Sequence, residues 1–167
     1  SYDIEKHHSG VRYAPPQLVN VKEAQWEWRA TVHNYLAHVG GSNKRGLRKD
    51  VWIIYHPGEG AKSHGVTMEQ KYLQDAKLLE EDLKQHPDNA RSQFYLGQSY
   101  KHAGHFKKAY AAYKKRVSMK GWFEENYVAQ LEVGRVAILL EESEDVVLRE
   151  LLTAFNQRPR RSEPLYE

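Results

Sequence analysis

The chain contains no cysteine and no long apolar run, and these two absences exclude several classes of protein. Without a thiol there is no disulfide scaffold, no thiolate zinc site and no cysteine nucleophile. No stretch reaches the roughly 18 consecutive apolar residues of a membrane-spanning helix, and the mean hydropathy is -0.80. Apolar residues nevertheless make up 40% of the chain, enough for a core. We therefore expect a folded protein with no membrane span and a cytoplasmic location.

Glycine and proline become scarce after Thr67, and this change predicts two parts. The first, residues 1–66, holds two runs rich in β-branched and aromatic residues, Trp26–His33 and Val51–His56, which predict strands. Because alternate residues of a strand share a face, Trp26 and Trp28 are predicted to lie together in a strand core. The second part, residues 67–167, has the three- and four-residue apolar spacing of amphipathic helices.

Helix start and stop signals divide the second part into five helices. Thr67 and Gln70 form a capping-box pattern, and the helix that follows should end before His86–Pro87. Asp88 or Asn89 should cap the second helix, and Gly104 should end it. The remaining three are expected from Phe106, over 122–140 and over 145–156.

One helix pair has the residue spacing of a tetratricopeptide repeat, whose period is roughly 34 residues. The matching core residues are Leu96, Gly97, Tyr100, Ala109 and Tyr113. Small side chains let two antiparallel helices approach while the tyrosines fill the flanking space. The corresponding small residue downstream, Gly134, is about one position out of phase. The predicted fold is mainly α: a tetratricopeptide-like antiparallel helix-hairpin stack after a small strand- and loop-rich segment.

A longer resemblance spans about three quarters of the chain, in matching order and spacing. It is carried by the runs at 28–36, 71–80, 87–91, 94–100, 121–122 and 158–166. Together they resemble bacterial family-2 glycosyltransferases that carry tetratricopeptide repeats after a GT-A catalytic domain. This resemblance implies that residues 1–66 are the end of a catalytic domain and that 67–167 are the first repeats, truncated at the C-terminus. The family's Asp-x-Asp metal motif does not occur here. We therefore expect the missing N-terminal catalytic domain to hold the donor site, and this chain alone to be inactive.

The same resemblance makes His33 a candidate metal ligand. Family members commonly close their metal and diphosphate site with a C-terminal histidine, and neutral imidazole suits Mn²⁺. Mn²⁺ or Mg²⁺ with a nucleotide sugar is thus implied for the full-length enzyme, and none is expected to bind tightly to this chain. The alternative is a strand histidine bonded to backbone. No catalytic residue is assigned.

Charge is segregated along the helical part. Residues 89–123 hold eight basic side chains and no acid, whereas residues 124–150 hold eight acids and two arginines. One interpretation is a basic surface that binds an acidic acceptor or partner, for which the candidates are Lys101, Lys107, Lys108, Lys114, Lys115 and Arg116. The other is that these charges pair between neighbouring helices and that the interleaved tyrosines form the core. Nucleic acid is not the expected ligand.

Two functions follow. The first is a fragment of a glycosyltransferase that moves a sugar from a nucleotide-sugar donor to a protein, peptide or glycan acceptor, with the repeats binding the acceptor or a partner. The alternative is a non-catalytic tetratricopeptide interaction module whose N-terminal strands cap the helices.

Overall fold

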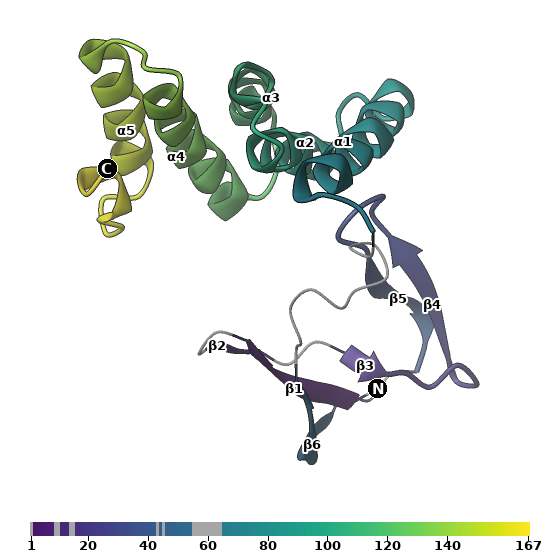
Figure 1. Ribbon diagram of the computed structural model, residues 1–167. Coiled ribbons are helices and arrows are strands. Elements are labelled where there is room, and N and C mark those ends of the chain that lie inside the picture. Colours follow the sequence, from purple (N-terminus) through teal and green to yellow (C-terminus); the bar gives the residue numbers. More distant parts are fainter. Residues whose placement is uncertain (1, 9–10, 14–15, 43, 45, 55–64) are drawn as a thin grey trace. The chain divides into compact units, whose positions relative to one another are not determined.

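The computed structural model describes residues 2–8, 11–13, 16–42, 44, 46–54 and 65–167. It contains two compact units, Ser1–His64 and Gly65–Glu167, which we describe separately. The first is built of strands and the second of helices (Figure 1). The predicted mainly helical fold, preceded by a small strand segment, is confirmed.

A sheet in the first unit is organised around β1 (Tyr2–His8). Two short antiparallel strands pair with it, β2 (Val11–Tyr13) and β3 (Pro16–Leu18). A longer strand, β6 (Gly46–Ile54), pairs with β1 in parallel. Of these strands the sequence predicted only the end of β6, because the others are short or polar and are recognisable only through their partners.

A separate hairpin is formed by β4 (Ala24–Arg29) and β5 (Tyr35–Gly41), which pair antiparallel. The strand predicted over 26–33 is therefore confirmed for 26–29 and wrong for 30–33. Ala30 and His33 have φ of 71° and 49°, so the chain turns between the two strands rather than continuing straight. His33 thus lies in a connection and not in a strand.

The tryptophans of this hairpin do not form the predicted strand core. Trp28 is 67% exposed. Trp26 is half-buried, and its indole N–H donates to the Asn20 carbonyl at 3.1 Å. A single-layer hairpin offers few partners for large side chains, which is why strand alternation alone did not place them.

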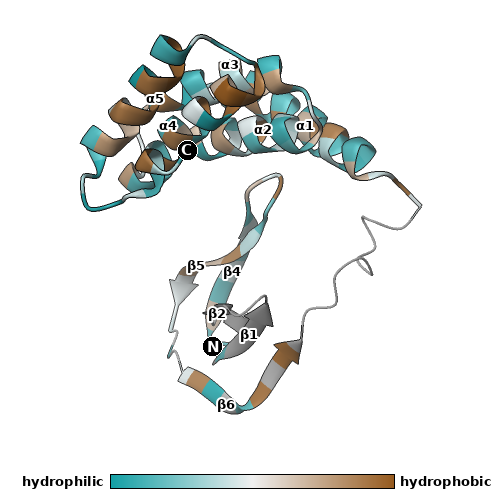
Figure 2. Cartoon of the chain, turned by 60° about the vertical axis from the view of Figure 1, so that its left-hand side comes forward, coloured by the Kyte–Doolittle hydropathy of each residue, from teal (hydrophilic) through white to brown (hydrophobic). Residues whose placement is uncertain are grey.

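The second unit contains five α-helices, each packed against its neighbours in chain order (Figure 1). Their bounds are α1 Met68–Gln85, α2 Ala90–His102, α3 Phe106–Ser118, α4 Phe123–Leu139 and α5 Glu144–Gln157. A short 3-10 helix, η2 (Glu163–Leu165), follows them. Apolar and hydrophilic residues alternate along each helix in Figure 2, as expected for elements with one packed face. Among the described residues no helix is long and apolar enough to cross a membrane.

The predicted capping residues of α1 and α2 and the predicted end of α2 are confirmed, and the bounds predicted for α4 and α5 are within one residue of those observed. At α1, the Thr67 hydroxyl accepts from the Gln70 backbone N–H and the Gln70 side chain accepts from the Thr67 N–H, forming a capping box. The Asn89 side chain caps α2 by accepting from the Ser92 N–H. Gly104 follows α2 with φ of 76°, a conformation that a side chain disfavours.

Close packing of α2 on α3 depends on the absence of a side chain at Gly97. A Cβ there would lie 2.7 Å from the Tyr113 ring. Tyr113 is 1% exposed and Ala109 is fully buried, so the ring has no free space to move into. The five residues that carried the repeat pattern are all buried.

The α4–α5 hairpin repeats this arrangement. A Cβ at Gly134 would lie 2.4 Å from Leu151, so Gly134 allows the same close approach as Gly97. A matching pair of hydrogen bonds crosses each hairpin. Gln93 donates to the Ala112 carbonyl and Gln130 donates to the Glu150 carbonyl, both at 3.0 Å. The offset of Gly134 in the sequence therefore does not alter its structural role.

Candidate functional site

Three of the six candidate binding cations are engaged within the helical unit. Lys101 of α2 pairs with Glu132 of α4. The Lys114 ammonium of α3 lies 3.1 Å from Glu150 of α5, where its side chain remains 45% exposed. These two ion pairs join α2 to α4 and α3 to α5, so part of the basic charge is matched by the acidic segment that follows it.

Arg116 is excluded as a residue that binds a partner. Its side chain is fully buried, and its Nε lies 3.0 Å from the Glu125 carboxylate. The same guanidinium donates to the Met119 and Trp122 carbonyls at 3.5 and 3.3 Å. Arg116 instead holds the connection between α3 and α4, so its prediction as a binding residue is wrong.

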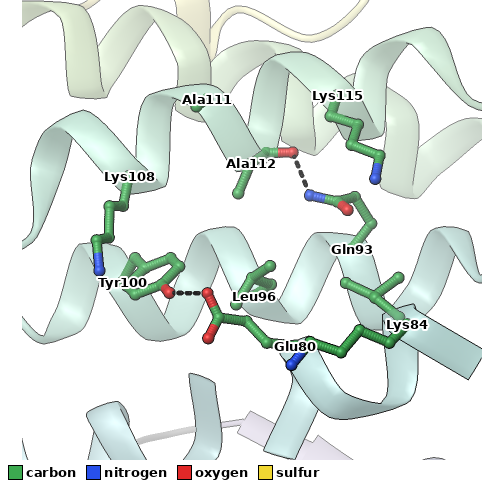
Figure 3. Close-up of a pocket in the computed structure, with 10 residues that line it drawn as sticks. Glu80, Lys84, Gln93, Leu96, Tyr100, Lys108, Ala111, Ala112 and Lys115 are labelled. Carbon is green, nitrogen blue, oxygen red and sulfur yellow. Dashed lines mark hydrogen bonds between the residues drawn. The ribbon is translucent and has the colours of Figure 1, made fainter. Parts of the chain in front are cut away.

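The remaining candidates, Lys107, Lys108 and Lys115, are exposed on α3. Two of them, Lys108 and Lys115, line a pocket of about 610 Å³ formed by α1, α2 and α3 (Figure 3). Lys84 of α1 is a third lysine of this pocket. Within the described part of the chain, none of the pocket's three lysines forms an ion pair.

The pocket has an apolar lining beneath these charges. It is formed by Leu83, Leu96, Ala111 and Ala112. Gln93 is fixed beside them by its bond to the Ala112 carbonyl, which Figure 3 shows as a dashed line. A surface of this kind can cover aliphatic side chains of a ligand while the ammonium groups attract negative charge.

Tyr100 and Glu80 place a polar pair within the same pocket. The Tyr100 hydroxyl donates to the Glu80 carboxylate (Figure 3). The Lys108 ammonium lies 5.1 Å from the centre of the Tyr100 ring, within the range of a cation–π contact. Burial, followed by the bond to Glu80, raises the pKa of Tyr100 to about 12. Tyr100 therefore remains a hydrogen-bond donor at neutral pH.

Two tyrosines of the basic segment, Tyr100 and Tyr113, are core residues. Tyr100 is 6% exposed and Tyr113 only 1%. The Tyr113 ring packs edge-on against Phe94, with ring centres 5.9 Å apart. Tyr100 and Tyr113 thus belong to the core, as the interpretation with charges paired between helices predicts, and neither ring can stack on a base.

His33 is exposed in the connection between β4 and β5. Among the residues that the structure describes, no three His, Asp or Glu side chains gather as a metal site would require. The described part of this chain therefore does not by itself provide a ligand set for Mn²⁺ or Mg²⁺. The role of His33 as one ligand of a larger site stays a prediction.

Glu80 and Lys84 were missed by sequence reasoning, which looked for binding residues only in the basic segment 89–123. They are four residues apart on α1, so they share a helix face. That spacing was a usable signal, but only the packing of α1 on α2 shows that this face borders the basic segment.

A search of protein-family models finds no match to the chain, and a search of curated proteins finds none either.

Proposed function

We propose that the helical unit binds an acidic polypeptide through the pocket between α1, α2 and α3. The observation that carries this proposal is the combination of unpaired lysines with an apolar lining at one place. Each exposed lysine alone would be an ordinary solvated side chain. Three that surround apolar surface favour a ligand with both carboxylates and aliphatic groups.

The resemblance to family-2 glycosyltransferases supports a setting for this binding. In that setting the unit follows a catalytic domain that transfers a sugar from a nucleotide-sugar donor, and the polypeptide is the acceptor or a partner of the enzyme. His33 would contribute to holding Mn²⁺ or Mg²⁺ at the donor diphosphate. The metal ion would stabilise the negative charge of the diphosphate leaving group. We propose a cytoplasmic location, consistent with the lack of cysteine.

A plain interaction module remains the alternative function. It requires the same pocket and the same polypeptide ligand. It differs only in that the helical unit is not attached to a catalytic domain. The packing of the helices and the location of the lysines support the binding role in both cases.

Neighbouring lysines on α3 provide a matched test of binding. Lys108 lines the pocket and Lys107 does not, although both are exposed. The probe is a fluorescein-labelled octapeptide of alternating Glu and Leu, titrated with the full chain by fluorescence anisotropy. Lys108→Gln should weaken binding about two- to fivefold, the effect of an ion pair at an exposed side chain, whereas Lys107→Gln should change it less than twofold.

Salt and peptide sequence provide the controls. Raising salt from 50 to 500 mM should weaken binding because exposed charges are screened over roughly 10 Å at 0.1 M. A peptide with Gln in place of Glu should bind more weakly than the acidic probe. Equal effects of the two lysine substitutions, or no saturable binding of the acidic peptide, would contradict the proposal.

A further inference from the structure

The pocket between α1, α2 and α3 already holds one carboxylate, and that carboxylate belongs to the chain itself. Glu80 accepts the hydrogen bond of the Tyr100 hydroxyl within a pocket that Lys84, Lys108 and Lys115 also line (Figure 3). Tyr100 is fixed in place because its ring is buried. Glu80 is exposed, and the buried residues of α1 are Ala76 and Leu79. The Glu80 side chain can therefore turn towards solvent without disturbing the core.

We infer that a carboxylate side chain of the bound polypeptide takes the place of Glu80 on the Tyr100 hydroxyl, so that Glu80 is a built-in competitor of the ligand. This inference rests on the proposed function. It adds the group that is recognised, an Asp or Glu side chain, and the residue that limits its affinity.

The chemistry of the pocket favours a carboxylate over a phosphate. Its described lining provides three ammonium groups and one hydroxyl, and none of these residues is an arginine. Guanidinium groups are the side chains that match phosphate with two parallel hydrogen bonds. The hydroxyl is meanwhile bonded to a carboxylate, which demonstrates that a group of this size and charge fits.

Competition between Glu80 and the ligand carboxylate predicts the direction in which a Glu80 substitution changes binding affinity. While Glu80 is in place, it neutralises part of the lysine charge and occupies the hydroxyl donor. An incoming carboxylate must displace it, which lowers the apparent affinity by the fraction of time that the donor is free. Removing Glu80 should therefore strengthen binding, although the residue lines the binding pocket.

The test compares two adjacent glutamates of α1. Glu80 lines the pocket and Glu81 does not, both are exposed, and both substitutions to Ala remove one negative charge and favour the helix. With the Glu–Leu octapeptide as probe, Glu80→Ala should tighten binding about tenfold, the expected size for a hydrogen bond to a charged group. Glu81→Ala should change it less than twofold.

Tyr100→Phe identifies the donor. It removes the hydroxyl but keeps the ring, and circular dichroism shows whether the helices remain intact. In this background Glu80→Ala should lose most of its gain, because the ligand can no longer use the hydroxyl. A phosphorylated version of the peptide, with phosphoserine in place of Glu, should gain less from Glu80→Ala than the carboxylate peptide does.

The outcomes separate this inference from the proposed function. If the wild-type chain binds the peptide in a Lys108-dependent way but Glu80→Ala weakens binding or matches Glu81→Ala, the competitor role is overturned and the binding function stands. A gain that survives in Tyr100→Phe overturns the role of the hydroxyl. Should neither the wild-type chain nor Glu80→Ala bind the peptide, both the inference and the proposed function fail.

Discussion

At the scale of single residues, Gly97 and Gly134 occupy similar places, and an added carbon at either should destabilise the fold. Alanine favours a helix over glycine by about 1 kcal/mol. At residue 134 a Cβ would lie 2.4 Å from Leu151 Cδ2 and 2.8 Å from Leu151 Cγ. Leu151 is a buried core residue, so Gly134→Ala should also destabilise, by about 1 to 3 kcal/mol. At residue 97 the nearest atoms belong to the buried Tyr113 ring, so Gly97→Ala should destabilise by about 1 to 3 kcal/mol through overpacking.

Urea unfolding followed by circular dichroism measures both variants. If both variants were as stable as the wild-type chain, the Tyr113 ring and the Leu151 side chain would have to move aside freely, against the close packing described above. A loss at residue 134 alone would contradict the packing described for the two hairpins.

Another residue-scale prediction concerns acid. Burial raises the pKa of Glu150, but hydrogen bonds from Gln130 and Lys114 and the Lys114 charge outweigh it, so the pKa of Glu150 lies below its ordinary value. Its ionised form therefore stabilises the fold above the ordinary pKa of a glutamate, and that stability is lost as pH falls through the lowered value. Lys114→Gln should raise the pH midpoint of acid unfolding.

Lys115→Gln is the matched control, because Lys115 is exposed and neighbours Lys114 but has no described ion-pair partner. It removes the same charge and should leave the acid midpoint nearly unchanged. Identical shifts for the two variants would mean that net charge, and not the Glu150 contact, sets the acid stability.

At the scale of helices, the connection from α3 to α4 depends on a buried ion pair. Arg116→Met leaves the Glu125 carboxylate without its partner in a buried position, which should cost about 3 to 5 kcal/mol. Replacing both residues, with Arg116→Met and Glu125→Leu, removes the unpaired charge and should recover most of that loss. The unfolding free energies of the single and double variants measure this, and a double variant no more stable than Arg116→Met would contradict the assignment.

Helices were largely predictable from the sequence because their signals are local. Thr67, Asn89 and Gly104 act on backbone groups within a few residues, so each could be identified without knowing the fold. Strands β1 and β5 lack such signals, since their hydrogen bonds come from partners elsewhere in the chain. Lys108 and Lys115 could be named as candidates because they lie in a basic segment that is visible in the sequence. Glu80 could not, because it joins them only through the packing of α1 on α2.

At the scale of the whole molecule, the prediction concerns the sugar donor. We propose that the donor site lies in a separate catalytic domain, because the Asp-x-Asp motif that binds the metal in the family this chain resembles does not occur in its sequence. Isothermal titration of this chain with nucleotide diphosphate sugars and Mn²⁺ should therefore show no binding tighter than about 1 mM, near -4 kcal/mol. Micromolar affinity would contradict the view that the donor site requires a separate catalytic domain.

The order of packing in the helical unit also determines how it should respond to force. Each helix packs mainly on the helix next to it in the chain, so α1 and α5 at the two ends of Gly65–Glu167 are not packed on each other. Tension applied between those ends would be carried through one helix pair at a time. In an optical trap the unit should therefore come apart in several small steps, one hairpin after another, and reassemble quickly when the tension is released.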